Sequence, residues 1–121
     1  KGVDSGKGDL AIVEVAKQVT KQDHTVVAVT GATDIVPDGE RVAEISGGSS
    51  MTPLVTGTGC LLSTVVAAGL VGSDDVFAAT VSVLQDYKRV AEIAAAEGQQ
   101  VGDFQVAFLN ALQQVSTGDA A

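Results

Sequence analysis

Residues 25–30 read TVVAVT, a continuous run of β-branched and small apolar side chains that Gly31 ends. Such a run is typical of a strand that is buried on both faces of a parallel sheet. Before it, residues 9–22 place apolar and polar side chains on opposite sides at helical spacing, as an amphipathic helix does. A helix that leads into a buried strand predicts an α/β fold.

A β-hairpin is predicted directly after this strand. Residues 35–36 and 41–45 lie on either side of Pro37-Asp38-Gly39. Proline presets φ at one turn position and glycine tolerates left-handed backbone at another, so this tripeptide predicts the turn of the hairpin. Residues 47–50, GGSS, are then predicted to form a loop.

Three helices are predicted in the rest of the chain. A continuous apolar run predicts a helix over residues 61–68 that is buried nearly all round. Helical spacing predicts a second helix over 74–97 that Gly98 ends, and Asp103 is predicted to cap a third. We expect residues 116–121 to fray. The third helix carries one apolar stripe, made of Phe104, Ala107, Phe108, Ala111, Leu112 and Val115.

The composition predicts a single folded domain without a nucleic-acid partner. The chain has 121 residues, of which 45% are hydrophobic, and this is enough to bury a real core. Asp and Glu number 15 against 7 Lys and Arg, so a net charge of −8 would repel the phosphates of a nucleic acid. Aromatic residues make up 3%, with no Trp, which leaves no platform for stacking single-stranded bases.

The sequence also predicts an intracellular, cytoplasmic protein without a membrane partner. The most apolar uncharged stretch, residues 61–71, is shorter than the about 20 residues that a membrane-spanning helix needs. No signal peptide is recognisable at the start of the chain. Cys60 alone cannot form an internal disulfide, and together with His24 alone it cannot build a structural zinc site.

The strongest chemical signal is Gly57-Thr58-Gly59, which opens the helix predicted from residue 61. Free N–H groups at a helix N-terminus, two glycines that let an anion approach and the positive end of the helix dipole together make a phosphate site. The loop is not a Walker A loop, because no lysine follows the second glycine, and Leu62 occupies the third glycine position of a dinucleotide fingerprint. A tight turn without a ligand is the alternative that this pattern leaves open.

Other candidate site residues lie near this loop or at the end of the predicted strand. Cys60 starts the helix, where the dipole lowers the pKa of a thiol, so it is a candidate base or nucleophile. The alternative is a small buried residue. Thr30 and Asp34 follow the carboxyl end of the strand, the edge where α/β sheets bind ligands, although Asp34 is also a common turn former. His24 lies at the opposite end and is predicted to be structural.

Three segments together match one family in order and spacing, namely Val29–Asp34, Val55–Ser63 and Gly102–Gln105. They resemble the C-terminal half of the hydroxyethylthiazole kinases, which are ribokinase-like enzymes of thiamine salvage. Ribokinase relatives carry an Asp where this family carries a Cys, so Cys60 favours this branch. The resemblance covers essentially the whole chain. It implies that residues 1–121 are the C-terminal part of one α/β domain with the three-layer α/β/α ribokinase-like fold.

The resemblance implies ATP-dependent phosphorylation of the hydroxyl group of 4-methyl-5-(2-hydroxyethyl)thiazole, with Mg²⁺. It implies that Thr30 contacts ATP, that Gly57 lies near the thiazole and that Cys60 holds the position of the catalytic base. The N–H groups of Thr58 and Gly59 would bind the transferred phosphoryl group. Because this family places its sites between the subunits of a trimer, a homo-oligomer is expected.

The chain also departs from the family pattern. Ala32 stands where Glu is usual, Gly47-Gly48-Ser49 replaces Asn-Gly-His, and Leu54 replaces Lys. The N-terminal half of the family, with an Asn-x-x-Glu motif linked to magnesium, has no counterpart here, so no metal ligand is assigned. Because the chain begins with Lys1 and not Met, we expect a fragment, a processed chain or an expression product that lacks its N-terminal part. Pairing with a separate N-terminal half stays open.

Three alternative functions stay open on the sequence. The first is phosphorylation of a pyrimidine or sugar alcohol, as a related small-molecule alcohol kinase with the same fold. The second is a non-catalytic fragment or assembly module that packs against partner chains through its apolar helices. The third, a cysteine hydrolase, is least favoured, because the sequence places no base beside Cys60.

Overall fold

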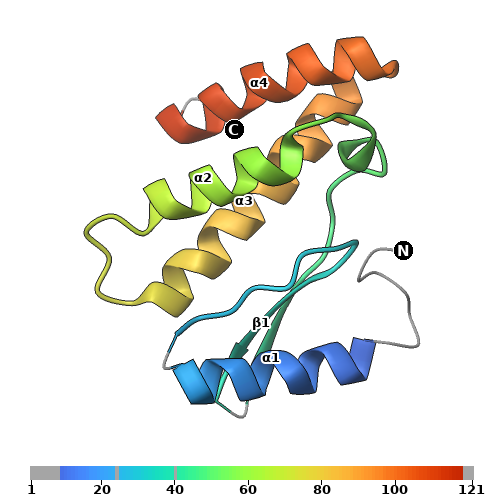
Figure 1. The fold of residues 1–121 in the computed structure, drawn as a ribbon. Helices are drawn as coiled ribbons and strands as arrows, with labels where there is room; N and C mark the ends of the chain where they lie inside the picture. The colour runs from blue at the N-terminus through green and yellow to red at the C-terminus, as the bar shows by residue number, and fades with distance from the viewer. Residues whose placement is uncertain (1–8, 24, 40, 119–121) are drawn as a thin grey trace.

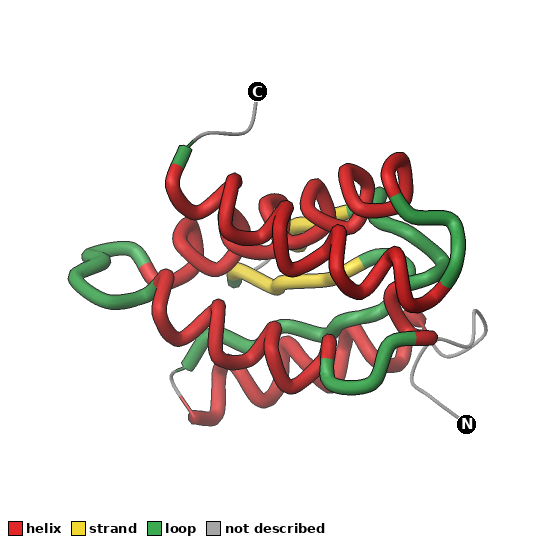
Figure 2. Tube along the Cα trace, turned by 90° about the horizontal axis from the view of Figure 1, so that it is seen from above, coloured by secondary structure: helices red, strands yellow, loops and turns green. Residues whose placement is uncertain are grey.

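The computed structural model describes residues 9–23, 25–39 and 41–118. The elements are α1 (Asp9–Asp23), β1 (Asp34–Asp38), β2 (Arg41–Ile45), the 3₁₀ turn η2 (Thr52–Leu54), α2 (Thr58–Gly69), α3 (Val76–Glu97) and α4 (Val101–Thr117). They stack in layers: α1 lies against the hairpin of β1 and β2, α3 contacts the hairpin and also α2, and α4 packs along α3 (Figure 1). The loop of residues 70–75 projects from one end of the molecule in both ribbon and tube views (Figure 2).

The predicted hairpin is confirmed, with a shorter turn. β1 and β2 pair antiparallel, from Asp34 opposite Ile45 to Asp38 opposite Arg41. Pro37 and Asp38 therefore belong to the strand, and the turn begins at Gly39, whose φ of 59° lies in the left-handed region. The Arg41 guanidinium forms an ion pair with the Asp38 carboxylate across the end of the ladder.

The strand predicted over residues 25–30 is wrong for the described chain. Only Val29 pairs, in an isolated bridge with Ile35 in which each N–H donates to the other residue's carbonyl at 2.8 Å. Thr25, Ala28 and Thr30 are exposed, and the valines between them are half-buried. A strand needs neighbours for its backbone groups and its two faces, and the described residues supply them only at Val29.

The three predicted helices after the hairpin are confirmed, with corrected ends. The third helix begins at Val101, and Gln100 occupies its N-cap position. Asp103 therefore lies in the first turn and does not cap the helix. An acidic side chain in the first turn still stabilises a helix through the dipole. This helix runs to Thr117, so the predicted fraying of residues 116–117 is wrong, while residues 119–121 lie outside the described part.

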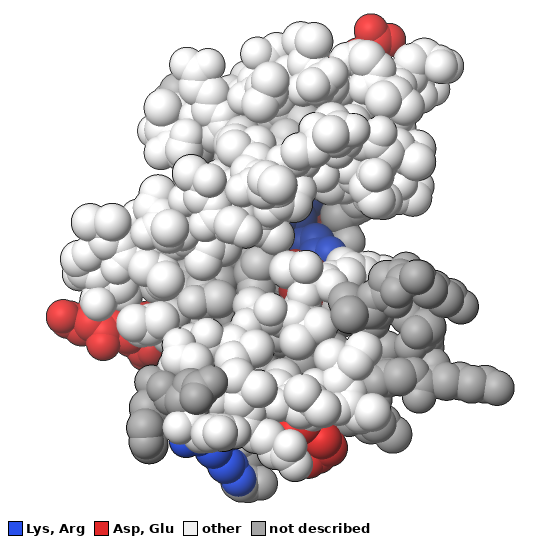
Figure 3. Space-filling model, viewed as in Figure 1, with Lys and Arg blue, Asp and Glu red and all other residues white. Residues whose placement is uncertain are grey.

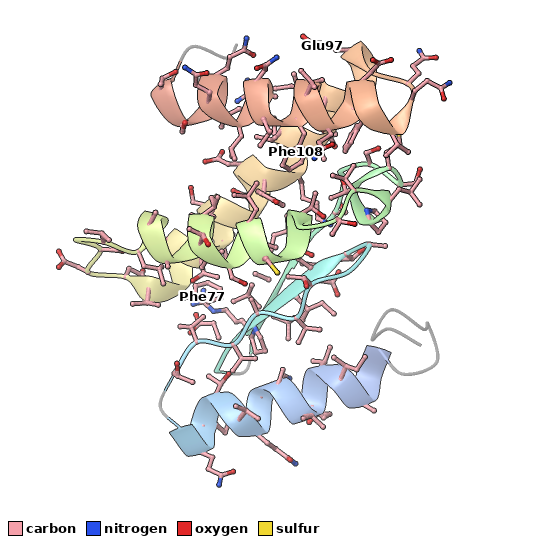
Figure 4. All side chains as sticks on the ribbon, turned by 45° about the horizontal axis from the view of Figure 1, so that its top comes forward. Phe77, Glu97 and Phe108 are labelled. Carbon is pink, nitrogen blue, oxygen red and sulfur yellow. The ribbon has the colours of Figure 1, made fainter. Side chains whose placement is uncertain are left out.

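The main core lies between α3 and α4. Tyr87 packs edge-on against Phe108 with ring centroids 5.2 Å apart, and Phe104 lies 5.8 Å from Phe108. Figure 4 shows Phe108 on the inner side of α4, between it and the helices beneath. The predicted stripe is confirmed, because Phe104, Ala107, Phe108 and Ala111 are buried and Leu112 and Val115 pack against them.

The prediction that the helix after Gly59 is buried nearly all round is wrong. In α2 only Thr58 is buried. The larger apolar residues Leu61, Leu62, Val65 and Val66 pack against the core clusters, whereas Ser63, Thr64, Ala67 and Ala68 are exposed. Small side chains give the helix an apolar composition on every side, but the described residues pack against one side only. No helix in the described part of the chain is long and apolar enough to cross a membrane.

Gly98 allows α3 and α4 to meet closely, and this makes a stability prediction. A Cβ at Gly98 would lie 2.6 Å from the Asp103 carbonyl carbon and 2.6 Å from the Phe104 nitrogen, and backbone atoms cannot easily move away. We expect Gly98→Ala to lower the free energy of unfolding by about 1–3 kcal/mol, as overpacking typically does. Urea denaturation followed by circular dichroism measures this.

Gly102→Ala is the matched control, because a Cβ at Gly102 in the first turn of α4 meets no heavy atom within 4 Å. Alanine is a better helix former than glycine, so this variant should unfold at the same or a higher urea concentration than the wild type. Equal stability of Gly98→Ala and the wild type would contradict the close approach of the two helices.

Candidate functional site

A pocket of about 730 Å³ opens between the N-terminus of α2, two loops and the middle of α3. This volume is typical of a small-molecule site. Figure 3 shows a hollow on this face of the molecule, between the upper helices and the lower layers, with blue Lys or Arg atoms inside it. The pocket is lined by residues 30–32, Asp34, residues 47–50, Thr52, Pro53, residues 55–59, Leu62, Tyr87, Lys88 and Ala91.

The Gly57-Thr58-Gly59 loop forms one wall of this pocket. Gly57 precedes α2 with φ 95° and ψ −6°, a left-handed conformation that favours glycine, and its carbonyl accepts the first helical hydrogen bond from Leu61 N–H at 2.9 Å. The N–H groups of Thr58, Gly59 and Cys60 therefore precede the first intrahelical bond. A Cβ at Gly59 would meet no heavy atom within 4 Å, so open space lies in front of this residue.

Thr58 is anchored by hydrogen bonds inside the protein. Its hydroxyl group lies 3.1 Å from the Thr52 carbonyl and 3.2 Å from the Val55 carbonyl, to which it donates. The Tyr87 hydroxyl donates to the Thr58 carbonyl at 2.5 Å, and burial raises the pKa of Tyr87 to about 12, so this donor keeps its proton at neutral pH. Because its hydroxyl is occupied, Thr58 offers a ligand its backbone N–H.

The loop from Thr30 to Asp34 forms the opposite side of the pocket. Thr30 is exposed there, and the Asp34 carboxylate is buried, with only 4% of the residue accessible. Asp34 Oδ1 accepts a hydrogen bond from Gly31 N–H at 3.0 Å, which closes a tight turn. Both readings of Asp34 thus hold, since it shapes the turn and also lines the pocket.

Lys88 of α3 also lines the pocket, and it is not among the site residues predicted from the sequence. Its Nζ donates to the Gly31 carbonyl at 2.8 Å and to the Ala32 carbonyl at 3.2 Å, and it lies 3.5 Å from Asp34 Oδ1. Its side chain is 16% exposed. The helical spacing from Leu84 to Lys88 to Ala91 places it on the buried side, and this is the signal in the sequence that could have found it.

Glu92, one helical turn after Lys88, holds the loop at Gly47 and Gly48. Its Oε1 accepts a hydrogen bond from Gly48 N–H at 3.0 Å. Gly47 and Gly48 have φ values of 103° and 88°, and a Cβ at Gly47 would lie 2.5 Å from Glu92 Oε1. Two charged residues of α3 therefore fasten two different loops to the pocket, one through carbonyl groups and one through an N–H group.

Cys60 is exposed and does not line the pocket among the described residues. The alternative that Cys60 is a small buried residue is therefore wrong. The thiol follows Gly59 directly on α2, beside the pocket wall and open to a substrate that approaches from outside. His24 lies outside the described residues.

No cluster of three or more His, Cys, Asp or Glu side chains that could hold a metal occurs in the described ranges. Asp34 is the single carboxylate among the described pocket residues, and it is paired with Lys88. Mg²⁺ in kinases is typically bound through one or two protein carboxylates together with substrate phosphates and water. The described pocket residues therefore offer one carboxylate, Asp34, and Lys88 lies beside it.

Comparison with known proteins identifies the family of this chain. The sequence model of the "Hydroxyethylthiazole kinase family" matches residues 1–118. The chain belongs to this family. A hydroxyethylthiazole kinase from Lysinibacillus sphaericus (strain C3-41) is 41% identical over 116 residues, which are 96% of this chain and 46% of the relative.

The hydroxyethylthiazole kinase fold is also shared. The solved structure of the Pyrococcus horikoshii OT3 hydroxyethylthiazole kinase protein superimposes with a TM-score of 0.78 at 32% identity, over 88% of this chain and 41% of that one. This confirms the predicted α/β class and the predicted ribokinase-like fold, and the chain forms only part of that fold. The chain spans less than half the length of both relatives.

The partial coverage gives a physical reason why residues 25–28 pair with no other described residue. In a hydroxyethylthiazole kinase fold of full length, more than half of the residues have no counterpart in this chain. Parallel strands pair with neighbours from distant parts of the sequence, so a strand pattern persists in a chain that lacks those neighbours. The roles that the family resemblance implies for Thr30, Gly57, Gly59 and Cys60 stay predictions.

Proposed function

We propose that the protein containing this chain is a hydroxyethylthiazole kinase, which transfers the terminal phosphoryl group of ATP to the hydroxyl group of 4-methyl-5-(2-hydroxyethyl)thiazole. The observation that carries this proposal is the Gly57–Gly59 helix N-terminus, which opens onto a pocket of small-molecule size in a member of this family. Because ATP is the phosphoryl donor, we place the reaction in the cytoplasm.

The pocket residues and Cys60, which lies beside the pocket, each take one role in this proposed reaction. The substrate hydroxyl oxygen attacks the terminal phosphorus of ATP, the bond from that phosphorus to the ADP oxygen breaks, and the hydroxyl proton passes to the sulfur of Cys60, which acts as the base. The N–H groups of Thr58 and Gly59 stabilise the charge on the transferred phosphoryl oxygens. Thr30 contacts the nucleotide, and Gly57 lies beside the thiazole.

Mg²⁺ enters this proposal without ligands from the described residues. Since Asp34 is paired with Lys88, we propose that a metal ion accompanying ATP is held by the nucleotide phosphates and by residues outside the described ranges. No step is assigned to the metal here. The experiment below includes Mg²⁺ as a variable for this reason.

The test is a substrate comparison with the intact protein as the organism makes it. The protein is incubated with ATP, with and without Mg²⁺, and with the thiazole alcohol, a pyrimidine alcohol or a sugar alcohol, and the phosphorylated product is measured by mass spectrometry. We expect kcat/KM for the thiazole alcohol to exceed the others by at least about 100-fold, the discrimination that a site built to fit one ring can reach. Preference for another alcohol would support the related alcohol kinase, and no ATP consumption with any of them would support the non-catalytic module.

The surface of α1 supports a further part of the proposal, concerning assembly. A groove of about 360 Å³ between α1 and the Val27–Val29 segment is lined by apolar residues, namely Ala11, Ile12, Val15, Ala16, Val19, Val27 and Val29. An apolar groove of this kind is a surface that folded proteins normally cover. We propose that residues 1–121 are part of one ribokinase-like domain and that its remaining part covers this groove. The family resemblance supports the further proposal that complete domains associate as trimers.

This assembly makes a prediction for the isolated chain. We expect residues 1–121 to self-associate, or to co-purify with the N-terminal half of the family domain when both are expressed together, because the groove would otherwise be exposed to water. Val15→Lys, which places a charge in the groove, should weaken this association at least about tenfold. Light scattering and pull-down measure both effects.

Val71→Lys is the control, because Val71 is an exposed valine in the loop between α2 and α3, away from the groove. It should leave the association unchanged. A stable monomer that binds no hydrophobic dye would contradict the proposed covering of the groove.

A further inference from the structure

Lys88 is the single Lys or Arg among the described residues that line the pocket. Its ammonium group lies among three oxygens from one loop: the Gly31 and Ala32 carbonyls and the Asp34 carboxylate. Gly48 lies close to the stem of the side chain, because a Cβ built there would lie 3.0 Å from Lys88 Cδ. The ammonium is therefore fixed in place and not a freely moving surface charge.

The charge of Asp34 explains why a fixed ammonium matters here. Asp34 is buried in the pocket wall, and its carboxylate shares the pocket with the N–H groups of Gly57–Gly59. A buried negative charge at that place repels a polyphosphate, and the chain as a whole adds to this with a net charge of −8. An opposite charge 3.5 Å away offsets the repulsion where solvent screening is weak.

We propose that Lys88 is a positioning residue for the nucleotide, which neutralises Asp34 so that the pocket accepts the polyphosphate of ATP. This inference rests on the proposed function for the identity of the ligand. It separates two tasks of Asp34. One Asp34 oxygen accepts the hydrogen bond from Gly31 N–H that shapes the turn, and a neutral amide oxygen can accept this bond as well. The negative charge of Asp34, in contrast, is compensated by the Lys88 ammonium.

The separation of these two tasks makes a double-mutant test possible. Lys88→Met keeps the apolar stem and removes the charge, so we expect the Kd and KM for ATP to rise about tenfold or more while kcat changes less than about threefold. Asp34→Asn alone keeps the acceptor for Gly31 N–H and leaves the Lys88 ammonium without its negative partner, so the Kd for ATP should stay equal or fall. Lys88→Met combined with Asp34→Asn should return the Kd to within about threefold of the wild type.

Direct binding in the intact protein, measured by titration calorimetry with ATP, inorganic tripolyphosphate and adenosine, keeps this test separate from the proposed reaction. The Lys88→Met effect should appear with ATP and tripolyphosphate and be absent with neutral adenosine. Lys17→Met, which removes a like charge on α1 outside the pocket, should leave all three affinities unchanged. If no alcohol is phosphorylated but this binding pattern holds, the proposed substrate is wrong and the role of Lys88 stands.

Two results would overturn the role of Lys88. One is an ATP affinity that Lys88→Met does not change, or that the wild type lacks entirely. The other is a double variant that binds ATP as weakly as Lys88→Met, because Lys88 would then act only by holding the Gly31 and Ala32 carbonyls and not through the charge of Asp34.

Discussion

Replacing Gly59 with valine in the intact protein is expected to abolish phosphoryl transfer while the fold stays intact. The fold tolerates the change because a Cβ at Gly59 meets no heavy atom within 4 Å. The branched side chain then fills the open space in front of the helix N-terminus and keeps the transferred phosphoryl group away from the N–H donors. Loss of such donors typically costs about 10²–10³-fold in kcat, and physical blocking of the site adds to this loss. Steady-state ATP turnover and the melting temperature are the two measurements.

Gly102→Val is the control for this prediction. Gly102 holds the second position of α4 as Gly59 does in α2, and a Cβ there also meets open space. The same substitution is thus made at an equivalent helix position that does not line the pocket. We expect this variant to keep its turnover. Unchanged kinetics in Gly59→Val would remove the assignment of this loop to phosphate.

Cys60→Ala is expected to lower kcat by about 10²–10⁴-fold, the usual contribution of a general base. Cys60→Asp should keep substantial activity, because a carboxylate can accept the same proton. The family resemblance also implies that ribokinase relatives carry an Asp at this position. The exposed position of Cys60 sharpens this expectation, because an aspartate there remains in contact with water and does not bury an unpaired charge. The kcat and melting temperature of both variants are measured in the intact protein.

The exposed Ser63, one turn further along α2, provides a control in the form of Ser63→Ala. Its hydroxyl donates to the Gly59 carbonyl at 3.4 Å, so the variant tests whether a small change in the first turns of α2 affects turnover by itself. We expect wild-type kcat within about twofold, as for most surface substitutions. Equal kcat in Cys60→Ala and the wild type would exclude the catalytic role of the thiol.

Much of the local structure could be predicted from the sequence. The spans of α1, α3 and α4 follow from apolar residues at helical spacing, and the hairpin follows from a turn signal between two short β-branched segments. The Gly57–Gly59 loop was recognisable for the same reason, since the free N–H groups and the left-handed glycine belong to neighbouring residues. Interactions between residues that are close in the sequence depend only on the local order of side chains, so they can be predicted from the sequence.

Burial could not be predicted in the same way. The apolar runs at residues 25–30 and 61–68 predict elements covered on all sides. Within the part of the chain that the structure describes, the first pairs only at Val29 and the second packs on one side. An apolar residue shows that covering it is favourable, but whether it is covered depends on which other segments are present to pack against it. Two relatives are more than twice as long as the part that matches residues 1–121, so more than half of each has no counterpart here.

The pocket likewise depends on contacts between distant parts of the chain. Lys88 and Gly31 are 57 residues apart, Tyr87 and Thr58 are 29 apart, and Glu92 and Gly48 are 44 apart. In the sequence, Tyr87, Lys88 and Glu92 belong to an ordinary helix with a polar side. Helical spacing shows which side chains share a face of the helix, but it does not show which other segment that face contacts. Packing of α3 against the hairpin and α2 turns this face toward the pocket and pairs Lys88 with Asp34, since a buried charge is stable only beside its partner.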